Sequence, residues 1–387
     1  MEFSNNRTPF IKNSNTQFIL DAIRSSSVSR VELARLSGLS KPAISAIVDS
    51  LIKDGIVTEM LRENTERGRK PTLLSIVPYC LFSVGVVISR EICCIGMVDL
   101  LGKIVRCSII DSPYHTVYET VDNIAGTLKD ILEKSGIPVN KVMGIGISMP
   151  GPVDSVSGRV LNPPNFDKWH NINITKMLTA VTGLPCYLEN QATAHAIAER
   201  LFGCSGKYSN YVSLLIEDGI GSSIIVDGVQ YNALNGLNPE FGHVSIDYNG
   251  KKCTCGGTGC LELYASEAAA LDYASKAGIP AVKWEDIVDY AIKGDAVASD
   301  VIQKVAAYLS VVIIDILNIL LPDAIIIQGK YKYKPDILLG YIHKNIANHY
   351  LFTQKNVDIV SSELDHDIFV LTSCSIVINK FLKGSLT

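Results

Sequence analysis

Residues 240–262 read EFGHVSIDYNGKKCTCGGTGCLE, and the interpretation of the whole chain begins with this stretch. It places one histidine and three cysteines in the spacing H-x9-C-x-C-x4-C, namely His243, Cys253, Cys255 and Cys260. One imidazole and three thiolates form a closed tetrahedral zinc site, which leaves no position for a catalytic water. Glycines at positions 256, 257 and 259 would let the loop turn tightly enough for three sulfur atoms to converge. The spacing therefore predicts structural zinc, and favours it over a chance cluster of free thiols.

The composition is that of a multidomain globular protein. The chain has 387 residues, more than one hydrophobic core usually holds, so two or three domains are expected. Hydrophobic residues make up 47% and charged residues 19%, which excludes a disordered chain. The net charge is −4, yet residues 1–79 carry 11 Lys and Arg against 8 Asp and Glu. A basic N-terminal region on an acidic body indicates a nucleic-acid-binding appendage.

No segment is expected to cross a membrane or to direct export. Residues 1–15 are polar and lack the apolar core of a signal peptide. The most apolar stretch, Val305–Leu321, contains Ser310, Asp315 and Asn318, which favours a buried helix over a membrane span. Ten cysteines without an export signal indicate reduced thiols, so a cytoplasmic location is expected.

Residues 1–78 are predicted to form a winged helix-turn-helix domain. Three successive helices are indicated by apolar faces, which comprise Phe18, Ile19, Ala22 and Ile23, then Val31, Leu33, Ala34 and Leu36, then Ile44, Ile47, Val48 and Leu51. Ser29 and Glu32 form a capping box that starts the second helix. Gly38 ends that helix, and Ser40 caps the third. Strands at 56–60 and 72–76 would enclose a charged tip at 62–70 and so form the wing.

The third helix and the charged tip are the predicted contacts to double-stranded DNA. The turn at 37–40 would leave the third helix free to enter a major groove. Contacts to phosphates and base edges are expected from Ser40, Lys41, Ala43 and Ser45. Contacts to a narrow minor groove are expected from Arg67, Arg69 and Lys70. The alternative is a helical bundle for protein contacts with a solvated basic linker, but the two features together favour DNA.

Short apolar strands and helices alternate beyond residue 79. Three strands, a helix, a strand and a further helix follow one another twice, which predicts a duplicated α/β architecture. The first lobe is expected at 79–189, joined by a C-terminal helix at 374–387. The second lobe, which carries the zinc loop, is expected at 190–373.

Two parts of the chain carry a family resemblance. Residues 253–262, preceded by Glu240-Phe-Gly-His243, resemble the signature of the ROK family of repressors, open reading frames and sugar kinases. Residues 33–45 and Gly68-Arg-Lys-Pro71 resemble its repressor branch, which includes xylose and N-acetylglucosamine repressors. The resemblance runs from about Asn15 to the C-terminus. It implies an actin-like, ribonuclease-H-type fold with two lobes and a sugar-binding site.

The resemblance also implies which side chains contact the sugar. The matching positions are Asn165, Asn190, Gln191, Glu240, His243 and Glu262. One nitrogen of His243 would bind zinc while the other faces the sugar. For Glu240 and Glu262 the alternative is an ordinary exposed carboxylate, and for Asn165 it is a turn residue. The effector would be a neutral sugar such as xylose, glucose, N-acetylglucosamine or a derivative, because each buried hydroxyl needs a polar partner.

The chain departs from the kinases of this family at four positions. Gln191 replaces their catalytic Asp, and an amide cannot accept a proton from a sugar hydroxyl. Residues 87–91 and 216–221 replace two glycine-rich phosphate loops, and residues 328–330 replace an adenosine-binding turn. No catalytic residue, no ATP binding and no enzyme activity are therefore expected.

The predicted function is a sugar-responsive DNA-binding repressor of carbohydrate-utilisation genes. A homodimer or tetramer would meet two operator half-sites together, and the sugar would change the spacing of its DNA-binding heads. Two alternatives stay open at this point. One is an active sugar kinase with a regulatory head, and the other is a repressor controlled by a partner protein instead of a sugar.

Overall fold

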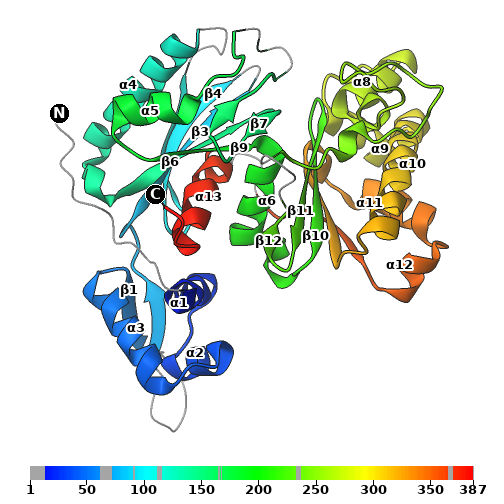
Figure 1. The fold of residues 1–387 in the computed structure, drawn as a ribbon. Coiled ribbons are helices and arrows are strands. Elements are labelled where there is room, and N and C mark those ends of the chain that lie inside the picture. The colour runs from blue at the N-terminus through cyan, green and yellow to red at the C-terminus, as the bar shows by residue number, and fades with distance from the viewer. Residues whose placement is uncertain are drawn as a thin grey trace. The chain divides into compact units, whose positions relative to one another are not determined.

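The computed structural model describes residues 14–61, 72–89, 92–110, 116–163, 166, 168–231, 237–364 and 369–386. The chain divides into two compact units (Figure 1). Unit 1 comprises residues 1–190 and 367–387, and unit 2 comprises residues 191–366. Each unit is built on its own five-stranded sheet.

The N-terminal part of unit 1 is a helix-turn-helix domain with a two-stranded sheet. Its elements are α1 (Ser14–Ser25), α2 (Arg30–Ser37), α3 (Lys41–Lys53), β1 (Val57–Leu61) and β2 (Thr72–Ile76). Ser29 and Glu32 form a capping box at the start of α2, and Gly38 ends that helix with a left-handed φ of 69°. The Ser40 side chain accepts the Ala43 N–H at 3.4 Å and caps α3. The helix ends predicted from the capping residues are confirmed.

Three apolar residues that the sequence pattern assigned to buried faces are exposed instead. Val31 is 65% exposed, Leu36 52% and Phe18 46%. The helix α2 has only eight residues and packs on α3 and β2 along one narrow line, so Leu33 is its one buried side chain. In α1 the buried face includes Leu20 in place of Phe18.

The sheet of unit 1 has the strand order β5-β4-β3-β6-β9. The strands are β3 (Phe82–Ile88), β4 (Cys93–Asp99), β5 (Ile104–Ile110), β6 (Val142–Met149) and β9 (Cys186–Asn190). The first three form an antiparallel meander, and β6 and β9 run parallel to β3. The larger helices are α4 (Val117–Ser135), α5 (Ile174–Thr182) and α13 (Phe369–Leu382), and the short elements are η1 (Val139–Lys141), β7 (Val153–Asp154) and β8 (Arg159–Val160).

The two faces of this sheet differ in side-chain size. Large residues such as Val84, Ile95 and Ile147 pack with α4 and α5 in one hydrophobic core. On the other face Gly85 of β3 lies opposite Gly96 of β4 and Gly146 of β6, so three glycines form a row across the sheet.

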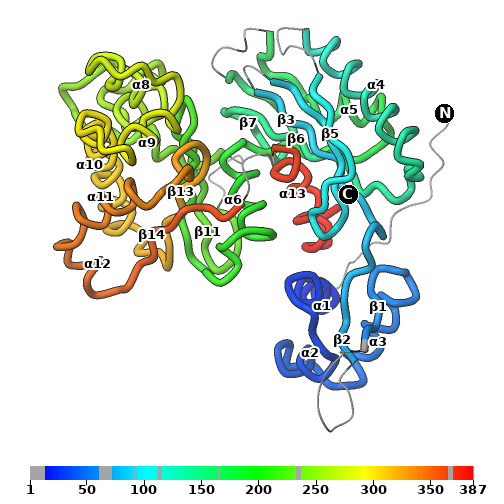
Figure 2. Tube along the Cα trace, turned by 180° about the vertical axis from the view of Figure 1, so that it is seen from behind, coloured from blue at the N-terminus to red at the C-terminus, as the bar shows by residue number. Residues whose placement is uncertain are grey.

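The glycine row accommodates α13, whose backbone lies directly on it. A Cβ atom at Gly146 would lie 2.0 Å from the Ser373 carbonyl oxygen, and one at Gly85 would lie 2.6 Å from the Val370 carbonyl oxygen. The Ser83 hydroxyl also donates a hydrogen bond of 2.8 Å to the Cys374 carbonyl. The C-terminal helix is thereby held beside β3 and β6, as both views show (Figures 1 and 2).

The sheet of unit 2 has the order β12-β11-β10-β13-β14. Its strands are β10 (Tyr211–Ile216), β11 (Ile220–Val226), β12 (Val229–Gln230), β13 (Ala324–Gly329) and β14 (Asp358–Ser361). The helices are α6 (Gln191–Phe202), α7 (Glu262–Ala265), α8 (Glu267–Lys276), α9 (Trp284–Ile292), α10 (Ala296–Ile319), α11 (Asp336–Ile346) and α12 (Tyr350–Gln354), with 3₁₀ turns η2 (Cys204–Lys207), η4 (Phe241–His243) and η5 (Lys330–Lys332). In both units an antiparallel meander is followed by two strands parallel to its first strand, which is the duplicated architecture expected from the sequence.

The helix α10 has the length and apolar composition of a membrane span. Its buried residues, among them Val305, Leu309 and Ile313, belong to the hydrophobic core of unit 2. Its neighbours are α8, α9 and α11. In the structure α10 is therefore a core helix of unit 2, which is the interpretation that the sequence favoured over a membrane span.

The glycine row predicts opposite effects for two alanine substitutions. Gly146→Ala is expected to lower the free energy of unfolding by about 1–3 kcal/mol, because the new methyl group must displace the α13 backbone. Gly126→Ala, in α4 with no atom within 4 Å of the new methyl group, is expected to raise it by about 0.5–1 kcal/mol. Urea unfolding followed by circular dichroism measures both. Equal stability of the two variants would contradict the close approach of α13.

Candidate functional site

Four metal-ligating side chains converge in unit 2. The ligand atoms of His243, Cys253, Cys255 and Cys260 all lie within 4.8 Å of one another. The His243 Nδ1 atom is 3.7 Å from the Cys253 Sγ atom, and the Cys255 and Cys260 Sγ atoms are 3.6 Å apart. A tetrahedral ion with metal–sulfur bonds of about 2.3 Å requires edges of about 3.8 Å, whereas a disulfide requires about 2.05 Å. The four side chains could therefore hold a tetrahedral metal ion.

Glycine and short backbone hydrogen bonds shape this loop. Lys252 and Thr258 form an isolated bridge, which turns the chain back between Cys253 and Gly257. Gly259 has a φ of 73°, and a Cβ atom there would lie 1.8 Å from the Asp247 carbonyl oxygen. A Cβ atom at Gly257 would lie 3.3 Å from two of the sulfur atoms. Two of the glycines therefore stand where a side chain would obstruct the loop.

A hydroxyl group on β11 positions the segment that carries Glu240 and His243. Ser222 donates a hydrogen bond of 2.6 Å to the Pro239 carbonyl and accepts one of 3.0 Å from the Phe241 N–H. The turn η4 then brings His243 to the cysteines through Nδ1, which leaves its Nε2 atom for another partner.

Glu262 approaches the same end of β11 from beyond the cysteine loop. Its Oε2 atom accepts the Ile220 N–H at 3.0 Å, and a Cβ atom at Gly219 would lie 2.5 Å from this oxygen. Desolvation, with a contribution from the charge of Glu262, raises the pKa of the partly accessible Glu240 to about 7. Unit 2 thus brings together Glu240, His243 and Glu262, and their atoms can both donate and accept hydrogen bonds.

The other predicted sugar contacts fall in different places. Gln191 is the first residue of α6 and is half-buried in unit 2. Asn190 is the last residue of β9 in unit 1, where it pairs with Met149 of β6. Asn165 lies outside the described residues.

Carboxylates occupy the turn after β10, where the family resemblance places a phosphate loop of the kinases. Burial, and then the charges of Glu267 and Asp218, raise the pKa of Glu217 to about 7, although the Lys330 cation opposes this shift. Of the other replaced loop, at 87–91, Arg90 and Glu91 lie outside the described residues.

A buried polar network lies beside this turn, and the sequence analysis missed it. Glu199 of α6 accepts hydrogen bonds from the Gln328 amide at 3.2 Å, the Ser362 hydroxyl at 2.5 Å and the Cys204 N–H at 2.7 Å. Burial, with the charge of Lys332, lowers the pKa of His195 to about 4, so this side chain is neutral. The available signal was the spacing of Gln191, His195 and Glu199, which recur every four residues along α6.

Of the residues predicted to contact DNA, those in the described part of the chain lie at the N-terminal end of α3. Ser40 and Lys41 are exposed, whereas Ala43 and Ser45 are half-buried. The wing residues Arg67, Arg69 and Lys70 lie outside the described residues.

Arg30 is a further residue of this domain that the sequence did not single out. Its Nη2 atom lies 2.7 Å from the Asp49 Oδ1 atom of α3 and 2.9 Å from the Glu59 Oε1 atom of β1. It therefore links α2 to both the third helix and the wing strand. Exposed ion pairs contribute only about 0–1 kcal/mol to the free energy of unfolding. We therefore expect Arg30 to orient α2 against α3 and β1 more than to stabilise the domain.

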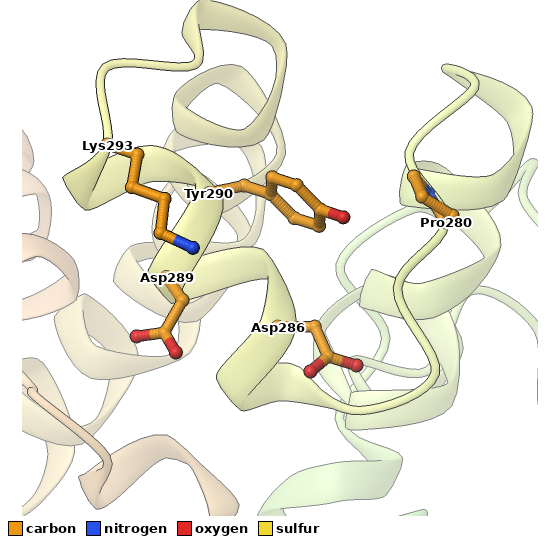
Figure 3. A pocket seen from close by; sticks show the side chains of 5 residues that line it. All are labelled: Pro280, Asp286, Asp289, Tyr290 and Lys293. Atoms are coloured by element: carbon orange, nitrogen blue, oxygen red, sulfur yellow. The ribbon is translucent and has the colours of Figure 1, made fainter.

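A shallow pocket of about 230 Å³ lies on and beside α9, as Figure 3 shows. Asp286 accepts the N–H groups of Val282 and Lys283, and Asp289 pairs with Lys334 at 2.7 Å. Because these carboxylates already have partners in the chain, the pocket does not compete with the metal cluster as the functional site.

Comparisons with known proteins identify both the DNA-binding part and the larger part of the chain. A model of the ROK family matches residues 83–377, and a model of winged helix-turn-helix DNA-binding domains matches residues 16–58. The xylose repressor of Bacillus spizizenii is 29% identical over 379 residues, which cover 96% of this chain and 97% of the repressor.

Two solved structures share the fold. A ROK family transcriptional regulator, a homologue of the Escherichia coli MLC protein, matches with a TM-score of 0.80 and 27% identity over 97% of this chain and 98% of its own. A ROK family glucokinase from Streptomyces griseus, in complex with glucose and AMPPNP, matches with a TM-score of 0.66 and 24% identity over 76% of this chain and 98% of its own, and this match concerns the fold alone. The predicted family and the actin-like fold of two sheets are confirmed.

The geometry of the four ligand atoms predicts one metal ion per chain. Cys260→Ser is expected to lose it, because one tetrahedral ligand is removed from a closed site. Cys186→Ser, which changes a half-buried cysteine of unit 1, is the matched control and is expected to retain the metal. Mass-spectrometric metal analysis of the dialysed proteins measures both. Equal metal content in the two variants would contradict the assignment of ligands.

Proposed function

Because the chain belongs to the ROK family, we propose that it is a sugar-responsive, DNA-binding repressor of carbohydrate-utilisation genes. The observation that carries this proposal is the pairing, in one chain, of a helix-turn-helix domain with a ROK domain in which Gln191 stands at the kinase base position. The similarity of the chain to a xylose repressor over nearly its full length supports it.

In this proposal residues 1–78 form the DNA-binding domain. Residues 79–190, with 367–387, form the first lobe of the sensor, and residues 191–366 form the second, so the C-terminal helix of the first lobe begins earlier than the residue 374 expected from the sequence. Major-groove contacts come from Ser40, Lys41, Ala43 and Ser45, and minor-groove contacts from Arg67, Arg69 and Lys70. A homodimer or tetramer in the cytoplasm presents two such domains to a palindromic operator.

Zinc is the metal proposed for the four-ligand cluster. Three thiolates and one imidazole suit zinc better than magnesium or calcium, which prefer oxygen ligands. With all four positions taken by the protein, the ion supplies no chemistry and serves to hold His243 in place.

The sugar is proposed to bind through Glu240, His243 and Glu262, together with Gln191, Asn190 and Asn165. The relationship to a xylose repressor makes xylose the first effector to test, followed by glucose and N-acetylglucosamine. No ATP binding and no enzyme activity are proposed, because Gln191 cannot act as a base and carboxylates stand where a phosphate would bind.

One prediction concerns Lys41, at the N-terminal end of α3. Lys41→Ala is expected to weaken binding to an operator obtained by in vitro selection, and to reduce the salt dependence by about one phosphate contact. Lys53→Ala removes the same charge from the other end of α3 and should leave binding nearly unchanged. Fluorescence anisotropy at several salt concentrations measures both. A larger loss with Lys53→Ala would argue against the proposed docking of α3.

A second prediction concerns the sugar. The effective sugar is expected to weaken operator binding by about tenfold, which is about 1.4 kcal/mol of coupling. At about pH 8, where a carboxyl group with a pKa of about 7 is mainly ionised, Glu240→Gln should weaken sugar binding by about tenfold or more, because a hydrogen bond to a charged group is lost. Zinc content and sugar-free operator binding should stay unchanged. Glu133→Gln, on the exposed face of α4, is the control. Calorimetric titration with the sugar panel gives the affinities.

The same protein preparation separates the remaining outcomes. Operator binding that no sugar changes, with no heat in calorimetry, would replace the sugar by another effector. ADP formation that depends on the sugar would show an active kinase and refute the non-enzymatic assignment. Absence of DNA binding would refute the repressor itself.

A further inference from the structure

Two cysteines lie on one face of the meander in unit 1. Cys94 of β4 pairs in register with Ile109 of β5, and Gly96 of β4 pairs with Cys107 of β5. Residues directly opposite each other, and residues two apart on one strand, share a face of a sheet. Cys94 and Cys107 are therefore diagonal neighbours on the same face. Cys93, one position earlier, points to the opposite face and belongs to the core with α4 and α5.

The residue directly opposite Cys107 on β4 is Gly96, so no side chain of β4 projects across from Cys107. The Val370 side chain of α13 packs over Gly96 on this face of the sheet. A disulfide needs Cα atoms about 4.4–6.8 Å apart, whereas diagonal neighbours lie about 7–8 Å apart, so closing the bridge requires a small movement of the edge strand β5 toward β4.

The two thiols differ in access to solvent. Cys94 is buried, whereas Cys107 is exposed on β5, the edge strand of the sheet. The hydrogen bond from Cys94 is the main cause that lowers the pKa of Cys107 to about 7. Outside the metal cluster the six other cysteines, all within the described residues, have raised pKa values. Cys107 thus combines exposure, thiolate character and an adjacent second thiol, the combination found in oxidant-sensitive cysteines.

We propose that Cys94 and Cys107 are a redox-active dithiol, which a hydroperoxide converts into a disulfide between β4 and β5. The Cys107 thiolate attacks the terminal peroxide oxygen and becomes a sulfenic acid, while the other oxygen leaves as an alcohol or as water after protonation. The Cys94 sulfur then attacks the Cys107 sulfur and releases the hydroxyl group as water, with its own proton completing that water. Two thiols lose two electrons in total, and the peroxide gains them. Thiol reductants reverse the change by exchange.

The direct test is treatment of the full-length, metal-loaded protein with hydrogen peroxide, followed by digestion without reduction and peptide mass spectrometry. The expected product is an intramolecular peptide pair joined through Cys107, lighter by two hydrogen atoms and released by dithiothreitol. Irreversible oxidation of Cys107 alone, or a disulfide between two chains, would overturn the proposal.

Substitutions at two neighbouring cysteines, Cys93 and Cys94, identify which of them pairs with Cys107. Cys93→Ala is expected to leave the cross-link and the alkylation rate of Cys107 unchanged, because Cys93 lies on the other face. Cys94→Ala should abolish the cross-link and allow dimedone to trap the sulfenic acid on Cys107. It should also slow alkylation of Cys107 by iodoacetamide at pH 7 by about threefold to tenfold, because the thiolate fraction falls when the donor is removed. Circular dichroism checks that both variants fold. An effect of Cys93→Ala equal to that of Cys94→Ala would refute the pairing.

Discussion

The contact between the backbone of α13 and the glycine row is the constraint on which unit 1 depends. Gly85, Gly96 and Gly146 leave no side chain between the sheet and the helix, so the carbonyl groups of Val370 and Ser373 lie directly against the strands. Interiors are close-packed, and a helix docked in this way has little freedom to slide. This contact also determines how the chain is divided between the two units. The last helix belongs to the first sheet, so unit 2 is an insertion within unit 1, tied to it at residues 190–191 and 366–367.

In unit 2 the comparable constraint is the start of β11. Ile220 donates its N–H to Glu262, and Ser222 holds the segment that leads to Glu240 and His243. The candidate site is therefore attached to a strand of the sheet, although most of its residues lie in loops. Sites on rigid elements keep their geometry better than sites on free loops. A metal ion bound to His243 would fix the same segment from its other end.

The parts of this structure that could be predicted from sequence are those encoded locally. Ser29 with Glu32, Gly38 and Ser40 act within one helical turn, so the ends of α2 and α3 followed from their residue types. The four metal ligands lie within 18 residues of one another, and their spacing alone indicated the cluster.

The features that the sequence did not reveal depend on distant partners. The glycine row requires the register of three strands and the return of a helix more than two hundred residues later. Glu199 and Ser362 are separated by 163 residues, and nothing near either one indicates the other. Val31 and Leu36 are exposed because the neighbouring elements cover only a small part of α2. The spacing of apolar residues predicts which side chains share a helix face, but not how much of that face is covered. Asn165 and the wing residues stay predictions.

The end of β10 contains the residues that support the proposed absence of nucleotide binding. Burial, and then the charges of Glu267 and Asp218, raise the pKa of Glu217 to about 7 against the opposing Lys330 cation, so negative charge is unfavourable at this side chain. A nucleotide phosphate would add more, and like charges about 6 Å apart repel by about 3 kcal/mol at an effective dielectric constant of about 20. Beside it, Glu199 has filled its oxygens with Gln328, Ser362 and Cys204, so it has little capacity left for a ligand. An Asp at position 191 would supply a base but would change neither of these features. Because catalysis needs binding and chemistry together, the proposed absence of kinase activity rests on two separate sets of residues.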